Sequence, residues 1–225
     1  MGQFDSTAAT FGGLKGFGQA FREEVRASQL VLRVSEQQTQ RANPVPGTLP
    51  HKSGGQGNPQ AAFAAGGSFR LEVFSRFGEL PQPIVEKTMR ALEVWLLLGS
   101  LGLRANRGGG SIWPSAGGPE SPEHLRARVD ALGCRWPVYL AGTEFGTSGD
   151  ALRAAATDTV SEPAWVFGTI SRGERLSSPL KMKVIRLGQV LRLLITAPDE
   201  RIILEAQKAL RGHRSKPEGW KKLPN

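Results

Sequence analysis

Residues 180–196 constrain the fold more than any other segment. Two apolar-rich runs, 180–187 and 189–196, are separated by the single glycine Gly188. Short apolar runs on either side of a turn residue predict two antiparallel strands joined as a hairpin. An antiparallel sheet is therefore expected in the core of this chain.

The periodicity of the apolar residues predicts the other regular elements. Strands are predicted at 28–35 and 68–75, where apolar and polar residues alternate. Helices are predicted at 83–98, 121–132 and 199–211, because apolar residues recur there at spacings of three and four. Residues 39–67 are rich in Pro, Gly, Gln and Asn and are expected to form a long mobile insertion. The pattern of residues 137–168 is mixed and predicts no particular element.

Strands and helices in this order, without regular βαβ spacing, favour the α+β class with antiparallel pairing. A ferredoxin-like (RRM-like) core with long insertions fits the order. We expect one domain over residues 1–225, with the mobile insertion at 39–67 and a basic C-terminal segment at 171–225.

Composition excludes several classes of protein. Hydrophobic residues make up 39% and charged residues 22%, which is typical of a globular chain. The single cysteine, Cys134, excludes an internal disulfide and a cysteine-rich zinc site. No apolar run reaches the length of a membrane span, and no signal peptide is recognisable at the N-terminus. A cytoplasmic protein without cofactor, metal or membrane partner is expected.

The charge is concentrated at the C-terminal end. Residues 171–225 hold 13 Lys and Arg against 5 Asp and Glu, so this segment carries +8 of the net +9. A concentrated surplus of this kind is typical of a polyanion-binding surface, and nucleic acid is the commonest such partner. A merely basic, solvated tail is the alternative.

Residues 98–113 form the most informative motif. Glycines surround Arg104, Asn106 and Arg107, so the main chain can approach a ligand closely, and the two exposed arginines can bind phosphate oxygens in pairs. A short strand is predicted at 111–113. The segment lacks the Gly-Lys-Ser/Thr of a Walker loop and the preceding strand of a dinucleotide fold. The alternative is a flexible turn with two solvated arginines.

The residues expected to bind RNA come from this motif and from the basic segment. They are Gly102, Arg104, Asn106, Arg107, Gly108, Gly109, Gly110, Ser111, Arg172, Arg175, Lys181 and Lys183.

Three segments together resemble a known family. They are Phe11-Gly-Gly with the strand that follows it, Trp95-Leu-Leu-Leu-Gly-Ser-Leu-Gly-Leu-Arg-Ala-Asn-Arg-Gly-Gly-Gly-Ser111, and Ser177-Ser-Pro-Leu-Lys-Met-Lys-Val184. In this order they are similar to the RAMP proteins of type III CRISPR effector complexes, and within them to the first-numbered Cmr subunit type of type III-B. Two departures stand out. Gly109 replaces the phenylalanine of the family's Gly-Phe-Gly. The strand and helix that usually precede the first segment are missing, so either the chain is a short variant or another subunit supplies the missing strand.

The resemblance implies a role. Members of this branch bind the guide RNA (crRNA) and its paired target RNA and contact other effector subunits in antiviral defence, while other subunits cut. We therefore expect a non-catalytic RNA-binding subunit. The alternative is a RAMP-type endoribonuclease that processes CRISPR transcripts, with His51 and Lys52 as general base. Exposed Trp113, Trp165 and Trp220 could stack on bases, and Trp95 and Trp136 are expected in the core.

Overall fold

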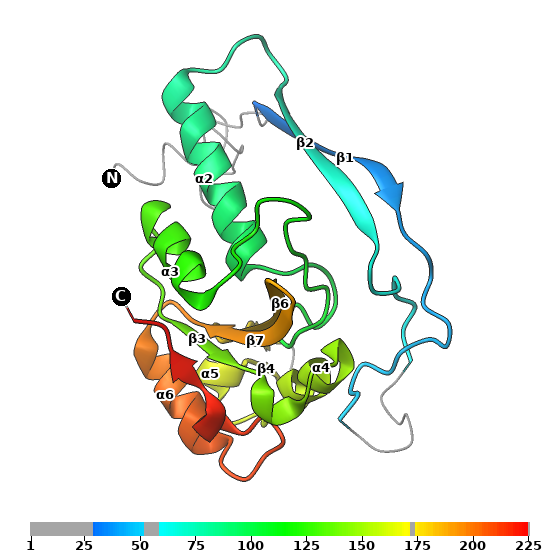
Figure 1. Cartoon of the computed structure of the whole chain (residues 1–225), viewed down its shortest axis with the longest axis vertical. Coiled ribbons are helices and arrows are strands. Elements are labelled where there is room, and N and C mark those ends of the chain that lie inside the picture. The colour runs from blue at the N-terminus through cyan, green and yellow to red at the C-terminus, as the bar shows by residue number, and fades with distance from the viewer. Residues whose placement is uncertain (1–28, 52–58, 172–173, 225) are drawn as a thin grey trace. The chain divides into compact units, whose positions relative to one another are not determined.

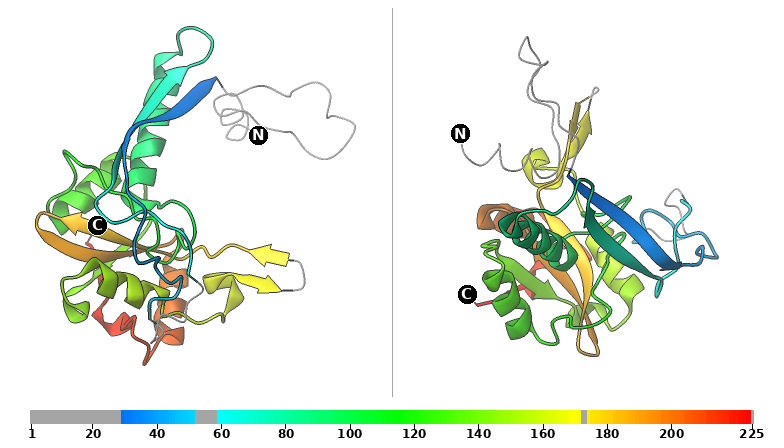
Figure 2. Two further views of the ribbon diagram at one scale, coloured as in Figure 1. Left: turned by 90° about the vertical axis from the view of Figure 1, so that its right-hand side faces the viewer. Right: turned by 90° about the horizontal axis from the view of Figure 1, so that it is seen from above.

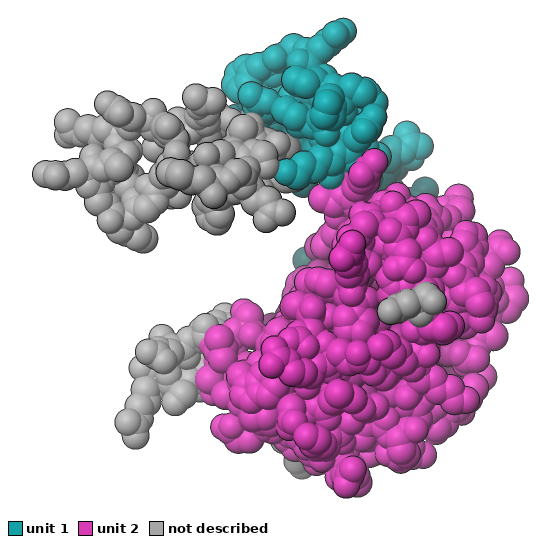
Figure 3. All heavy atoms as spheres, turned by 90° about the vertical axis from the view of Figure 1, so that its left-hand side faces the viewer, with its two compact units in different colours: residues 1–42, 63–89 teal, residues 43–62, 90–225 magenta. Residues whose placement is uncertain are grey.

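The computed structural model describes residues 29–51, 59–171 and 174–224. These residues form two compact units (Figure 3). The first unit holds the described residues up to Ala42 together with Phe63–Met89, and the second holds the described residues of Asn43–Ala62 and Arg90–Asn225. Contact density alone does not decide whether the units fold independently, so the single-domain organisation stays a prediction.

The first unit is built on an antiparallel pair of strands, β1 (Leu30–Gln38) and β2 (Ser68–Ser75). Leu32 lies opposite Val73 and Val34 opposite Leu71, so one face of the pair is apolar. The other face is charged, and it includes the ion pair of Arg33 with Glu72 at 3.4 Å. The helix α2 (Gln82–Leu98) begins in this unit and ends in the second.

The second unit contains a complete ferredoxin-like βαββαβ arrangement. Its strands are β3 (Val138–Ala141), β6 (Lys181–Leu187), β7 (Val190–Thr196) and β8 (Lys221–Lys222). The helices α4 (Gly149–Thr157) and α5 (Ala164–Phe167) connect β3 to β6, and α6 (Glu200–Ala209) connects β7 to β8. The sheet order is β6-β7-β3-β8 with antiparallel neighbours. The first and third strands of the unit are thus central, as the ferredoxin-like fold requires.

Alternation along the strands gives the sheet two apolar faces. Met182, Leu193 and Ile195 face α4, α5 and α6, and Trp220 joins the same cluster. Figure 1 shows these three helices on one side of the sheet and α3 (Pro122–Ala131) on the other. Each leucine or isoleucine buried in such a core stabilises it by about 1.5–3 kcal/mol.

The second face of the sheet is also covered. Leu140, Ile185 and Leu194 pack with Leu97 at the end of α2 and Leu125 of α3. The side-chain oxygen of Ser121 accepts the backbone N–H of His124, so Ser121 is the N-cap of α3. RRM domains stack RNA bases on an open sheet face. In this unit that face is buried, so a ligand must use an edge or a loop.

A short hairpin, β4 (Thr169–Ser171) with β5 (Glu174–Leu176), precedes β6 and extends away from the sheet (Figure 2). Two short 3₁₀ helices, η3 (Thr143–Phe145) and η4 (Pro217–Gly219), complete the regular structure of the described residues. Along the described residues no helix is both long and apolar enough to cross a bilayer.

The α+β class and the ferredoxin-like core are confirmed, and apart from the short strand predicted at 111–113 the predicted strands and helices lie within a few residues of their expected positions. The expectation of a sheet lacking a strand is wrong for this sheet, whose four strands all lie within 138–222. The segment Phe11-Gly-Gly, which contributed to the family resemblance, lies outside the described residues. The insertion is closed by isolated bridges between Arg41 and Phe63 and between Gly47 and Pro59, as in a hairpin excursion.

The C-terminal tail, described here from residue 213 to residue 224, packs against the core. Strand β8 pairs with β3, and the Leu223 N–H donates to the Val138 carbonyl at 2.9 Å. Trp220 is only 6% exposed, and its indole N–H donates to the Ser215 carbonyl. The apolar Trp220 and Leu223 anchor the tail to the core, which a count of charges along the sequence does not reveal.

Candidate nucleic-acid interface

The glycine-rich segment forms a closed loop directly after α2. The Gly99 N–H donates to the Trp95 carbonyl at 2.7 Å, where the helix ends. The Leu101 N–H donates to the Gly110 carbonyl at 2.9 Å, and Ser100 and Ser111 form an antiparallel bridge. The strand predicted at 111–113 is absent. Among the described residues Ser111 forms only this single bridge, and a strand requires several consecutive paired residues. Residues 99–111 together form the glycine loop.

The glycines are needed inside the loop rather than toward a ligand. Gly110 has φ +59°, and a Cβ atom there would lie 1.7 Å from the Leu101 carbonyl oxygen. A Cβ at Gly109 would lie 2.6 Å from the Leu103 carbonyl oxygen, so the phenylalanine of the related motif has no room here. The amides of Gly108 and Gly109 already donate to Met182 and Arg104 carbonyls. These two amides are therefore not available to bind an anion.

The loop is held against the free edge of β6. The Gly108 N–H donates to the Met182 carbonyl at 2.8 Å, and the Met182 N–H donates to the Asn106 carbonyl at 3.1 Å. The Val184 N–H donates to the Ser111 hydroxyl at 2.9 Å. These bonds satisfy backbone groups that an edge strand would otherwise expose. Ser111 and Asn106 thus position the loop.

Arg107 lies inside the fold, so the expectation that it is exposed is wrong. The side chain is 6% exposed and its guanidinium lies 5.4 Å from the centroid of the Phe167 ring. It donates to three carbonyl and two hydroxyl oxygens, at Asn106, Leu180, Phe167, Thr159 and Ser178. Burial, and then the nearby charge of Arg104, lower the pKa of Arg107 to about 10. Its geometry supports a structural role, and an RNA contact by Arg107 stays a prediction.

Lys183 is also fully buried. Its ammonium donates to the Leu96 carbonyl near the end of α2, and it lies 5.5 Å from the centroid of the Trp113 ring. Burial lowers the pKa of Lys183 to about 7. This amine joins β6 to the end of α2, and it cannot reach a phosphate in this arrangement.

Three cations near the loop remain accessible. Arg104 is exposed, whereas Lys181 and Arg153 are half-buried. The Lys181 ammonium donates to the Asn106 side-chain oxygen at 3.0 Å, and burial lowers its pKa. The Arg153 guanidinium donates to the Gly47 carbonyl at 3.0 Å, and its Cα lies 3.6 Å from where a Cβ of Gly108 would be.

The charges around the loop are not neutralised by carboxylates. Over residues 29–51, 59–171 and 174–224, neither the three accessible cations nor Arg107 and Lys183 form an ion pair. Other cations of the second unit do form ion pairs, as Arg126 does with Asp130 and Lys222 with Glu200. An un-neutralised cluster beside a sheet edge attracts a polyanion.

The remaining predicted residues do not all join this cluster. Gly102 is exposed at the tip of the loop, with φ +72°. Arg172 lies outside the described residues, and Arg175 belongs to β5, where its backbone pairs with that of Ile170. Sequence patterns missed Arg153, because it belongs to the segment 137–168 that predicted no element.

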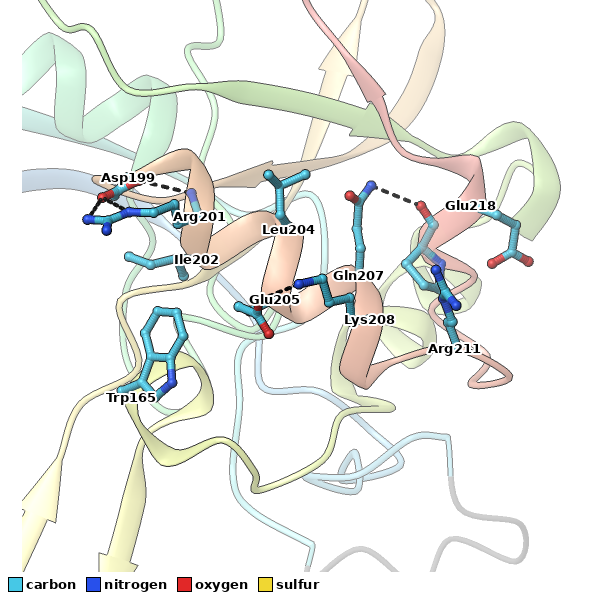
Figure 4. Close-up of a pocket in the computed structure, with 11 residues that line it drawn as sticks. Trp165, Asp199, Arg201, Ile202, Leu204, Glu205, Gln207, Lys208, Arg211 and Glu218 are labelled. Carbon is cyan, nitrogen blue, oxygen red and sulfur yellow. Dashed lines mark hydrogen bonds and ion pairs between the residues drawn. The ribbon is translucent and has the colours of Figure 1, made fainter.

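A groove lies along α6, apart from the glycine loop. This groove of about 1040 Å³ is lined by the apolar side chains of Trp165, Ile202 and Leu204 (Figure 4). Four of its charged side chains are paired locally: Arg201 with Asp199 at 2.7 Å, and Lys208 with Glu205 at 2.6 Å. Trp165 is 49% exposed, as expected for a stacking residue, but the three basic residues that line the groove are balanced by three acidic ones.

The other residues weighed for catalysis or stacking are placed as follows. The Nδ1 atom of His51 lies 3.1 Å from the Thr157 hydroxyl, and Lys52 lies outside the described residues. Within the described part of the chain, no group of three His, Cys, Asp or Glu side chains could hold a metal ion. Trp95, Trp113 and Trp136 are half-buried.

Comparison with known proteins was made against families, curated sequences and solved structures. No protein-family model matches the chain, and no curated protein matches its sequence. The crystal structure of Cmr1 from Pyrococcus furiosus, in its apo form, is similar with a TM-score of 0.53. The match covers 86% of this chain and 71% of that chain at 18% identity. This chain has a fold similar to that of Cmr1.

The resemblance inferred from the glycine-rich motif is thus confirmed at the level of the fold. A fold alone does not determine a function, because unrelated activities share folds. For a Cmr1-like fold the functional argument must come from the residues of this chain, and the glycine loop with its un-neutralised cations is the feature that carries it.

Proposed function

We propose that this chain is an RNA-binding subunit of a type III CRISPR ribonucleoprotein effector. It holds guide RNA and target RNA, contacts other effector subunits and does not cut RNA itself. The observation that carries the proposal is the cluster of Arg104, Arg153 and Lys181 around the glycine loop, which has no carboxylate partner among the described residues. The Cmr1-like fold supports the assignment to an effector of this kind.

The position of the cluster also favours RNA held at a sheet edge. Both faces of the four-stranded sheet are buried, so bases cannot stack on it as they do on an RRM. The glycine loop covers the outer edge of β6 and presents Arg104 to solvent. Phosphates of a single strand passing along this edge would meet the accessible cations, with forked donors from the two arginines.

A matched pair of double variants tests the binding site. Replacing Arg104→Gln together with Lys181→Gln removes two free cations, and we expect the affinity for single-stranded RNA to fall at least tenfold at about 0.1 M salt. Replacing Arg201→Gln together with Lys208→Gln removes the same charge from α6, where both cations are paired. That control is expected to change affinity less than threefold in fluorescence anisotropy. Equal losses in both variants would contradict the assignment of the loop.

The absence of cutting is tested separately. The protein is incubated with CRISPR repeat RNA in EDTA, and we expect the RNA to remain intact. Metal-independent cutting would favour the endoribonuclease alternative, and loss of that cutting in a His51→Ala variant would assign it to this chain rather than to a contaminating nuclease.

A further inference from the structure

The tip of the glycine loop exposes two leucines to solvent. Leu101 is 41% exposed and Leu103 is 62% exposed, and only Gly102 separates them. Arg104 follows directly and is also exposed. The cation cluster therefore has an apolar neighbour that no structural contact explains, and neither leucine belongs to the two core clusters.

The tip is a fixed structure rather than a loose turn. The Arg104 carbonyl accepts the Arg107 N–H at 2.7 Å and the Gly109 N–H at 3.0 Å. Leu101 is held at the neck of the loop by its bond to Gly110. Arg104 itself has φ +63°, a left-handed conformation that costs a residue with a side chain about 1 kcal/mol or more. The leucines are thus presented in one orientation, at some cost in stability.

We propose that Leu101 and Leu103 contact the faces of unpaired RNA bases whose phosphates lie on Arg104 and Lys181. The inference rests on the proposed function and specifies which chemical group of the RNA, the base, contacts the tip of the loop. The neighbouring charge decides between occupants: the leucines adjoin cations without carboxylate partners, and unpaired RNA combines apolar base faces with phosphates a few ångströms away. The contact carries no sequence preference, because every base has an apolar face.

An apolar contact and a phosphate contact have different salt signatures. Removing a phosphate contact lowers the affinity and also flattens the log–log salt dependence by about 0.7 per contact on a single strand. Removing a base contact lowers the affinity at every salt concentration by the same factor. The variant Leu101→Ser with Leu103→Ser is therefore expected to lose five- to thirtyfold in affinity, with an unchanged salt slope.

The experiment uses the full chain and single-stranded RNA oligonucleotides that carry one 2-aminopurine at successive positions. In the parent protein, the fluorescence of the base that contacts the tip changes on binding. In the double serine variant that change is lost, and the melting temperature stays within about 1 °C because both leucines are exposed. The matched control is Leu204→Ser, an equally exposed leucine on α6 at 44%, which leaves affinity and fluorescence as in the parent.

The outcomes are distinguishable. Parent protein that binds no RNA overturns the proposed function and the inference with it. Parent protein that binds RNA, while the double serine variant binds equally well, overturns only the inference and points to a protein surface as the occupant of the tip. A flattened salt slope in the serine variant also overturns it, since the leucines would then act by positioning Arg104.

Discussion

Arg107 and Lys183 are the two cations that burial places next to the glycine loop, and each is stabilised without a carboxylate. Arg107 keeps its charge at neutral pH, because its pKa falls only to about 10. It therefore depends on the five oxygen atoms that accept its N–H groups. A side chain without donors would leave several of these acceptors unpaired in a buried site.

Arg107→Met is expected to lower the free energy of unfolding by about 3 kcal/mol, since each buried acceptor left unsatisfied costs about 1–3 kcal/mol and relaxation recovers part of this. Urea unfolding followed by tryptophan fluorescence measures the loss. Arg104→Met, three positions away and exposed, should change stability by less than about 0.5 kcal/mol. For RNA binding we expect the reverse order. Arg104→Met should lower the affinity, because Arg104 contacts RNA directly in the proposed site, whereas Arg107→Met should change the affinity little. Equal stabilities would mean that the bonds of Arg107 contribute little.

Lys183 predicts a pH dependence of stability. In the unfolded chain its amine has the ordinary pKa of 10.5, whereas in the folded chain burial lowers the pKa to about 7. Between these values the unfolded state binds the extra proton, so stability rises with pH by up to about 1.4 kcal/mol per pH unit. This contribution is complete above pH 10.5 and is lost as the pH falls to about 7.

Lys183→Met keeps an unbranched apolar stem and removes the titrating amine. The variant should be more stable than the parent near pH 6, and the difference should shrink or reverse toward pH 10, where the neutral amine still donates to Leu96. Urea midpoints across this range measure the difference between the two proteins, in which other titrating groups cancel. Lys208→Met on the surface of α6 is the control. A parent-minus-variant difference that stays constant with pH would show that Lys183 does not titrate in the folded chain.

At the scale of elements, the glycine loop shows what a sequence pattern can and cannot predict. The glycine-rich motif after a helix correctly marked a loop at the edge of the core. The pattern could not predict which cations face solvent, because that depends on contacts with Thr159, Phe167 and Ser178, which are distant in sequence. The same limit applies to the C-terminal tail. Its run of basic residues did not indicate that the indole of Trp220 is buried in the core.

Two glycines of the loop provide a matched pair of variants. Gly102→Ala places a Cβ where nothing lies within 4 Å, so only its left-handed φ costs free energy, about 1 kcal/mol. Gly110→Ala adds the same strain and a collision with the Leu101 backbone. We expect Gly110→Ala to lower stability by more than about 2 kcal/mol and to weaken RNA binding. Calorimetry and anisotropy check both; similar results for the two variants would show that the neck of the loop rearranges freely.

The whole molecule distributes its charge differently from its sequence. Residues 171–225 carry +8, but their cations lie at separate places in the fold. Lys181 is at the glycine loop, Arg201 and Lys208 are paired on α6, and Lys222 is paired with Glu200. A surplus that is contiguous along the chain is therefore spread over several elements of the fold, and three of these four cations already have a carboxylate partner.

The salt dependence of RNA binding measures how much of this charge contacts phosphates. If the whole +8 of the basic segment contacted phosphates, the log–log slope on single-stranded RNA would be near −5 or −6, at about −0.7 for each phosphate. The accessible cations at the loop, Arg104, Arg153 and Lys181, with one or two weaker neighbours, predict a slope of about −2 to −3. Fluorescence-anisotropy titrations between about 50 and 400 mM salt, a range in which counterion release dominates the affinity, distinguish the two slopes. A slope of −5 or steeper would assign RNA to the outer face of α6 and the tail as well, and a slope near zero would remove phosphate contacts as the basis of binding.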